Sequence, residues 1–147
     1  MKKIILLAIM TIVSIGCSKD EAETTKNATL FCNISTDIGS ASSGTAIALV
    51  FEDNGKEIDN AASGRNGTTI SIVFKDGTST QSYKYMGSST VNTFNDVPYG
   101  KYILFAYYAP YGLLYYYSIK KVEVNKRVES FDMKFITSGN FGYQEWN

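Results

Sequence analysis

The stretch FNDVPYGKYIL, residues 94–104, carries the most specific structural signal in this 147-residue chain. Pro98 and Gly100 predict that the chain turns at the edge of a sheet. Tyr102 follows two residues after the glycine. Its ring can be buried while its hydroxyl reaches back to the backbone near the turn, as in the tyrosine corner of β-sandwiches. The stretch therefore predicts a sandwich whose strands lie on both sides of it in the sequence.

Strand signals recur along the rest of the chain, separated by clusters of Gly, Asn, Asp and Ser. Residues 45–52 (TAIALVFE) are almost continuously apolar, which predicts a central strand covered on both faces. Lys75–Thr78 predicts a hairpin turn that leads into a polar edge strand. We expect an all-β domain, a seven- or eight-stranded antiparallel β-sandwich, with strands at 28–35, 45–52, 68–75, 78–85, 88–94, 101–108, 113–124 and 128–136.

The stretch around Pro98 resembles the F-x-x-V/L-P-x-G-x-Y-x-L signature of transthyretin-like domains, including the carboxypeptidase regulatory-like kind. Val122-Glu123-Val124 is similar to the closing V-x-V strand of that family, so the resemblance covers roughly residues 68–136. The usual opening G-x-V-x-D is missing, which leaves the strand order of the first half open. The resemblance implies an accessory or binding module of the transthyretin-like or immunoglobulin-like type, with no catalytic residues.

The N-terminus predicts a signal peptide. Lys2 and Lys3 precede twelve uncharged residues, 4–15, a segment too short to span a bilayer comfortably. Ser14-Ile15-Gly16-Cys17 resembles the lipobox of bacterial lipoproteins, in the relaxed form of the Bacteroidetes, with Ser14 where leucine is usual. The resemblance implies cleavage after Gly16, lipid on the sulfur of Cys17, and attachment to the membrane by that lipid. Each buried methylene contributes about 0.8 kcal/mol, so two or three acyl chains anchor a protein durably.

An acidic segment follows the cysteine directly. Ser18-Lys19-Asp20-Glu21 is similar to the signal that sends Bacteroidetes lipoproteins to the outer face of the outer membrane. A plain solvated tether is the alternative interpretation, and with it a periplasmic location. We expect a lipid-anchored protein at the bacterial outer membrane that faces the cell exterior. The chain then divides into a signal peptide (1–16), a lipidated cysteine with its tether (17–27), a β-sandwich (28–137) and a C-terminal tail (138–147).

Composition argues against several classes of function. Acidic and basic residues number 14 each, and removal of Lys2 and Lys3 with the signal peptide leaves 12 basic against 14 acidic residues. A charge near −2 does not favour nucleic-acid binding. The chain contains no histidine, the commonest general base and metal ligand. Cys32 would be left without a partner cysteine, so its thiol is expected to be buried. We therefore expect no enzyme, no cofactor and no metal.

The carboxylates of Asp53, Glu57 and Asp59 are the one group of side chains with metal-binding potential, since oxygen ligands suit calcium. Their spacing fits no EF-hand loop, and a solvated turn is the favoured interpretation.

Aromatic residues are the most unusual part of the composition, at 14 % of the chain. If Tyr102 and Leu104 face the core, alternate residues face outward and form an exposed aromatic stripe. The candidate binding surface comprises Phe105, Tyr107, Tyr111, Tyr115, Tyr116 and Tyr117. The alternative is that both faces are covered, one by the facing sheet and one by loops or a neighbouring protomer.

Three functions fit these features. The first is a non-enzymatic envelope lipoprotein whose sandwich binds a protein partner or serves as an accessory subunit of a surface assembly. The second is a carbohydrate-binding module, which requires two exposed, coplanar aromatic rings. Trp146 would contribute to such a platform unless it folds back onto its own domain, which is the usual position of a tryptophan in a tail. The third is a structural spacer with a featureless polar surface.

Overall fold

The structure is a computed structural model that describes residues 26–40, 45–111 and 114–146. These residues form an all-β fold, as predicted. Seven strands have five residues or more: β1 (Asn27–Thr36), β3 (Thr45–Glu52), β5 (Thr69–Val73), β8 (Val91–Pro98), β9 (Gly100–Tyr111), β10 (Leu114–Val124) and β11 (Val128–Phe135). Five have two or three residues: β2 (Gly39–Ser40), β4 (Gly64–Asn66), β6 (Ser79–Thr80), β7 (Tyr85–Gly87) and β12 (Gly142–Tyr143).

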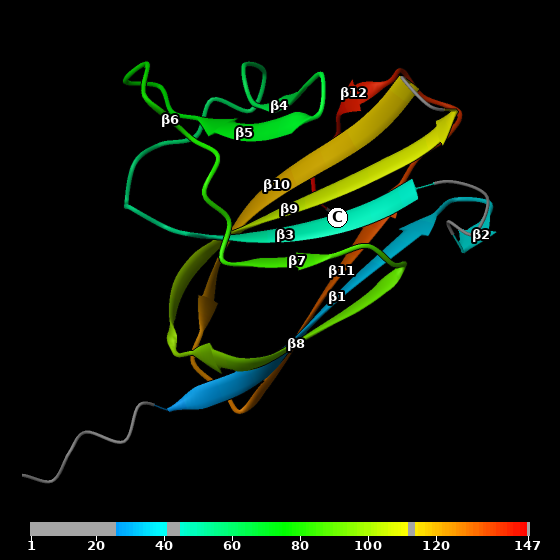
Figure 1. Ribbon diagram of the computed structural model, residues 1–147. Coiled ribbons are helices and arrows are strands. Elements are labelled where there is room, and N and C mark those ends of the chain that lie inside the picture. The colour runs from blue at the N-terminus through cyan, green and yellow to red at the C-terminus, as the bar shows by residue number, and fades with distance from the viewer. Residues whose placement is uncertain (1–25, 41–44, 112–113, 147) are drawn as a thin grey trace, which may run out of the picture.

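The strands form three layers (Figure 1). In one outer sheet β1 is the central strand. It pairs with β11 on one side, and β8 and β2 also pair with β1. The middle sheet has the order β12-β10-β9-β3-β7. The third layer is a small sheet, β4-β5-β6, which lies over the other face of the middle sheet. The sandwich is thus present, and an additional layer covers it.

The expectation of purely antiparallel strands was wrong at two places. β1 pairs with β11 in parallel, from Thr29 opposite Val128 to Thr36 opposite Phe135. β12 also pairs in parallel with β10, so part of the predicted C-terminal tail belongs to the middle sheet. The sequence argument relied on turns between consecutive strands, and such turns produce antiparallel pairs. Neither parallel pair is joined by a hairpin, so turn signals carry no information about them.

The main core lies between the two larger sheets. The inward-facing side chains of β1 are Ala28, Leu30, Cys32 and Ile34, and each is at most 3 % exposed. They meet alternate residues of β3, β9 and β10, which include Val50, Leu104 and Tyr116. The alternation along β9 follows the prediction: Tyr102, Leu104, Ala106 and Tyr108 all belong to this core.

A second core lies between the middle sheet and the third layer. Leu49 and Phe51 of β3 pack against Ile72 and Phe74 together with four residues of β9, Ile103, Phe105, Tyr107 and Ala109. Residues 45–52 are therefore covered on both faces, as their apolar run predicted. This second core uses the side of β9 that was expected to form an exposed stripe.

The turn at residues 98–102 has the predicted geometry. The hydroxyl of Tyr102 donates a hydrogen bond of 2.8 Å to the carbonyl oxygen of Pro98, and the Tyr102 ring is 6 % exposed. The amide of Tyr99 donates to the carbonyl of Lys26, which ties this turn to the beginning of β1. The tyrosine corner therefore holds the start of β9 beside the start of β1.

The strand expected at residues 78–85 was wrong. The turn at Asp76-Gly77 exists, with Gly77 at φ 83° and the Thr78 amide bonded to the Asp76 carboxylate. Only Ser79–Thr80 continues as a strand, and the chain then crosses to the middle sheet, where β7 pairs with β3. The segment is polar, so it lacks the apolar face that would hold one long strand against the core. It forms two short strands instead, of two and three residues.

Asn92 organises the connection between β7 and β8. Its side chain is 3 % exposed, and its Nδ2 donates to the carbonyls of Cys32 (3.1 Å) and Ser89 (2.7 Å). Its Oδ1 accepts from the Ser89 amide at 3.1 Å. Gly87 lies directly against it, since a Cβ atom at that position would be 2.2 Å from Asn92 Oδ1. The sequence offered no sign of this buried amide.

Ser118 is an isolated hydroxyl in the main core. Its side chain is fully buried on β10, and its Oγ has no hydrogen-bond partner among the described residues. Burial of an unpaired hydroxyl costs about 1–3 kcal/mol. We expect Ser118→Ala to stabilise the protein by about 1 kcal/mol and to raise Tm by about 3 °C.

Calorimetry of the full chain measures this effect, with Ser130→Ala as the matched control because Ser130 is exposed on β11. The control should change stability by less than about 0.5 kcal/mol. A lower Tm for Ser118→Ala would mean that the hydroxyl has a partner in solution.

Candidate functional site

The prediction that the aromatic side chains form an exposed binding surface is wrong. Phe105, Tyr107, Tyr116 and Tyr117 are at most 5 % exposed. Tyr115 is half-buried, and the side chain of Tyr111 lies outside what the structure describes. The third layer covers Phe105, Tyr107 and Tyr117 on one face of β9 and β10, whereas Tyr116 faces the main core. The structure supports the alternative left open by the sequence, that both faces are covered, and the second cover is a small sheet rather than a loop or a neighbouring protomer.

The buried tyrosines attach the third layer to the middle sheet. The hydroxyl of Tyr115 donates to the carbonyl of Arg65 at 3.0 Å, and that of Tyr117 donates to the carbonyl of Asn60 at 2.8 Å. Burial, with smaller contributions from Tyr115, Tyr143 and Asp59, raises the pKa of Tyr117 to about 12. A tyrosine suits this role because its ring fills the core while its hydroxyl satisfies a loop carbonyl.

Tyr116 points to the opposite face and holds the C-terminal segment. Its hydroxyl donates to the carbonyl of Thr137 at 2.8 Å, and its ring centroid lies 4.8 Å from that of Phe141. Trp146 packs against the main core and is half-buried, with the Lys120 ammonium 5.9 Å from its ring centroid. The expectation that a tryptophan near the C-terminus folds back onto its own domain is confirmed.

The carbohydrate hypothesis requires two exposed rings side by side. The exposed aromatic side chains of the described residues include Tyr83 (46 %) and Phe141 (41 %). Tyr83 contacts the buried ring of Phe51, and Phe141 contacts the buried ring of Tyr116. Neither of these contacts joins two exposed rings.

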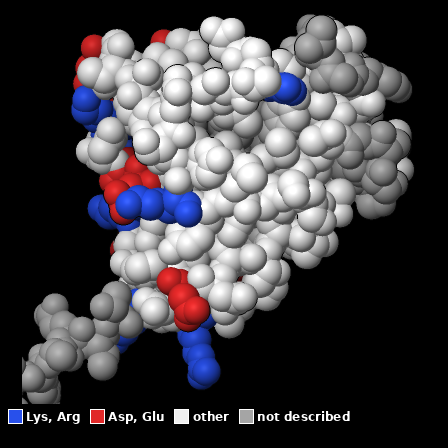
Figure 2. All heavy atoms as spheres, viewed as in Figure 1, with Lys and Arg blue, Asp and Glu red and all other residues white. Residues whose placement is uncertain are grey.

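Charged side chains of both signs lie close together. In the view of Figure 2 most of the face is uncharged, and acidic and basic side chains gather along one edge and at the lower end. Ion pairs join Lys56 to Asp76 and Lys84 to Glu52. These pairs are exposed and contribute little to stability, but they neutralise charge locally.

The three carboxylates considered for calcium are each engaged elsewhere. Asp53 pairs with Lys121 at 2.8 Å, and Glu57 pairs with Lys75. Asp59 Oδ1 accepts the amides of residues 61 and 62, as in an ordinary turn. No three acidic, histidine or cysteine side chains come together as a metal site within residues 26–40, 45–111 and 114–146.

The thiol of Cys32 is buried in the main core, at 1 % exposure, as predicted. Burial raises its pKa to about 12, and the charge of Asp132 acts in the same direction. A thiol nucleophile must be ionised and accessible, so Cys32 is chemically inert in the folded protein. Cys17, Gly16 and the segment Ser18–Glu21 lie outside the described residues.

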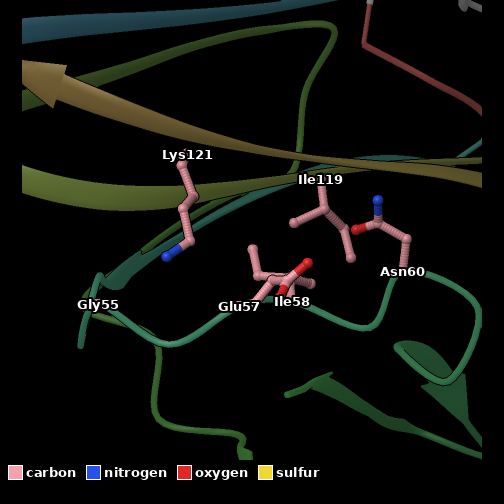
Figure 3. A pocket seen from close by; sticks show the side chains of 6 residues that line it. All are labelled: Gly55, Glu57, Ile58, Asn60, Ile119 and Lys121. Carbon is pink, nitrogen blue, oxygen red and sulfur yellow. The ribbon is translucent and has the colours of Figure 1, made fainter. Parts of the chain in front are cut away.

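Two pockets among the described residues are candidate binding sites. The first, of about 420 Å³, lies between the loop 55–60 and β10 (Figure 3). Ile58 and Ile119 form its apolar part. Its polar groups are engaged: Lys121 and Glu57 are in the ion pairs above, and Asn60 Nδ2 donates to the Tyr143 hydroxyl at 2.9 Å. A ligand here would have to break existing interactions.

The second pocket, of about 330 Å³, lies where β4 and β5 cover the end of β3 and β9. Its lining residues are Thr45, Ile47, Arg65, Thr68, Ile70, Tyr107 and Ala109. Arg65 forms an ion pair with no described carboxylate. Sequence reasoning missed this pocket, because residue 65 lies between the expected strands 45–52 and 68–75, and only the β4–β5 pairing brings Arg65 over β9.

Comparison with known proteins finds no family model, no curated protein and no solved structure that matches the chain. The transthyretin-like resemblance of residues 68–136 therefore stays a prediction. Among the described residues there is no helix of the length and hydrophobicity needed to cross a membrane.

Proposed function

We propose that this protein is a non-enzymatic lipoprotein of the bacterial outer membrane, anchored by lipid on Cys17 and facing the cell exterior. Its β-sandwich binds a partner, either alone or as an accessory subunit of a surface assembly. The observation that carries the proposal is the order of features at the N-terminus: a charged start, twelve uncharged residues, Gly16-Cys17, and an acidic segment. A folded domain begins ten residues after Cys17, at Asn27.

The position of the first strand supports a role in which the domain holds a binding site away from the membrane. Asn27 pairs with Pro98, so the tether joins the domain beside the start of β9 (Figure 1). Ala109 lies near the other end of β9, nine residues after Gly100, which at ~3.3 Å per residue is about 30 Å along the strand. The pocket that contains Ala109 and Arg65 is therefore far from the tether. An anchored domain of this shape holds its second pocket away from the lipid.

The chemistry of the side chains favours recognition over catalysis. The sequence lacks histidine, and the Cys32 thiol is buried with a raised pKa. The carboxylates near the first pocket are held in ion pairs or turns. A hydrolase or transferase needs a base, nucleophile or acid that can meet a substrate.

The test of the proposal is Cys17→Ser in the full chain, expressed in a Bacteroidetes host. We expect labelled palmitate to be incorporated into the natural chain and absent from the variant. The variant should move from the membrane fraction to the soluble fraction, because a hydroxyl cannot take the place of the thiol that is lipidated. Protease treatment of intact cells should remove the natural domain, because we place it outside the cell.

Cys32→Ala is the matched control, since it removes the other cysteine of the chain. It should keep both the label and the membrane location. A Cys17→Ser protein that still sediments with membranes would disprove the lipid anchor, and a domain protected from protease on intact cells would disprove the external location.

A further inference from the structure

We infer that the pocket between β4–β5 and the end of β3 and β9 binds a carboxylate group, with Arg65 as its principal ligand. The inference rests on the proposed function in one respect, that recognition is the work of this domain. Its evidence is separate: the fixed position of the Arg65 guanidinium, the excess of hydrogen-bond donors around it, and the charge and size of the pocket.

The Arg65 guanidinium is held in place by neutral groups. Its Nε donates to the carbonyl of Gly67 at 2.6 Å, and one terminal nitrogen donates to the hydroxyl of Tyr107. Its Cζ lies 5.6 Å from the centroid of the Tyr107 ring. A guanidinium has five N–H donors, so these two bonds leave three donors for a ligand. The side chain is thus oriented in advance, which lowers the entropic cost of binding an anion.

The pocket presents more donors than acceptors. The Tyr107 hydroxyl accepts from Arg65, and its own proton has no acceptor among the described residues. The hydroxyls of Thr45 and Thr68 also make no hydrogen bond to another described residue. The described lining contains no acidic or amide side chain. A ligand that supplies acceptor oxygens would satisfy these groups, and a carboxylate offers two that match the planar guanidinium fork.

The charge and size of the pocket restrict the class of ligand further. Arg65 is the one charged residue among the described residues that line the pocket, which suits a monoanion better than a phosphate dianion. Ile47 and Ile70 provide an apolar wall for the part of the ligand next to its carboxylate. The volume of about 330 Å³ is at the lower end for ligand pockets. It suits a small organic acid or a single acidic side chain of a partner protein, and these two sources share the chemistry proposed.

The test is an NMR titration of the full chain, purified in a mild detergent and labelled with ¹⁵N. The chain has two arginines, Arg65 and Arg127, so two Nε–Hε signals report on the two guanidinium groups. The probes are acetate, N-acetylglutamate N-methylamide, which represents an acidic residue within a protein, and inorganic phosphate. We expect both carboxylates to shift the Arg65 signal with saturation and to leave the Arg127 signal unchanged. Phosphate should bind at least tenfold more weakly.

Variants separate charge from geometry. Arg65→Gln should weaken carboxylate binding at least tenfold, and Arg65→Lys should recover only part of it, because an ammonium lacks the fork. Arg127→Gln is the matched control, since Arg127 is exposed and distant from the pocket lining. It should bind as the natural chain does. If Arg65→Gln does not fold, the two signals of the natural chain still decide the question.

Each outcome supports or overturns the inference. Tenfold tighter binding of the glutamate derivative than of acetate would identify a protein side chain as the source, and equal binding would identify a free acid. Equal shifts at Arg65 and Arg127, or tighter binding of phosphate, would overturn the carboxylate site. The titration does not depend on the lipid anchor. The Cys17→Ser experiment can therefore disprove the anchor while carboxylate binding is observed, and the titration can disprove the carboxylate site while the anchor is observed.

Discussion

Gly87→Ala is expected to destabilise the domain by roughly 4–6 kcal/mol, because it displaces a buried amide from its hydrogen bonds. A Cβ at residue 87 would lie 2.2 Å from Asn92 Oδ1 and 2.8 Å from Asn92 Cβ. The three hydrogen bonds of Asn92 contribute about 1 kcal/mol each, and overpacking adds about 1–3 kcal/mol. Such a loss is a large part of the roughly 5–15 kcal/mol by which a domain is stable.

Urea unfolding of the full chain measures the loss, with the fluorescence of Trp146 as the signal, since this single tryptophan packs against the main core. Gly100→Ala is the matched control, because a Cβ there would be 3.6 Å from the nearest Tyr102 atom, an ordinary contact. It should cost less than about 1 kcal/mol.

A double-mutant cycle identifies the cause of the Gly87 effect. Asn92→Ala removes the two closest contacts of the new Cβ, so Gly87→Ala should cost at least about 1 kcal/mol less in that background. Equal costs in both backgrounds would show that the loss at Gly87 does not come from its contact with Asn92.

Phe105→Ala should also lower the free energy of unfolding by roughly 3–5 kcal/mol, the usual cost of truncating a buried phenylalanine. Phe105 is fully buried in the second core and stacks on Tyr117, with ring centroids 5.6 Å apart and planes 13° apart. On an exposed binding stripe, the same substitution would cost less than about 0.5 kcal/mol. The experiment therefore distinguishes the two interpretations of the aromatic stretch.

Leu114→Ala provides the comparison, because Leu114 is on the neighbouring strand β10 and is 50 % exposed. We expect it to change stability by less than about 0.5 kcal/mol in the same urea titration. Similar small values for Phe105→Ala and Leu114→Ala would mean that the third layer does not cover β9 in solution.

The sequence predicted the local features well because each depends on residues that are neighbours in the chain. The alternation along β9, the two-sided burial of residues 45–52 and the bond from Tyr102 to Pro98 all follow from local patterns. The position of Cys32 in the core follows from the same alternation along β1.

The candidate site depended instead on contacts between distant segments. The stripe on β9 was correctly placed on one face, but periodicity cannot show what covers that face. In the layer that does so, β5 lies within the predicted strand 68–75, but β4 and β6 have only three and two residues, too few for a recognisable pattern. The pocket at Arg65 exists because residue 65 pairs with residue 70 and lies over Tyr107, 42 positions away.

The parallel pairing of β1 with β11 has a consequence for the time at which this domain can fold. Thr36 meets Phe135, so β1 gains this neighbour only after residue 135 has been synthesised, later than its other partners β2 and β8. Contacts of such long range slow folding, because closing a long loop costs entropy before any contact repays it. For a chain exported as we propose, this delay is useful: the unfolded polypeptide stays competent for translocation, and its leader is recognised before a folded body can obstruct passage.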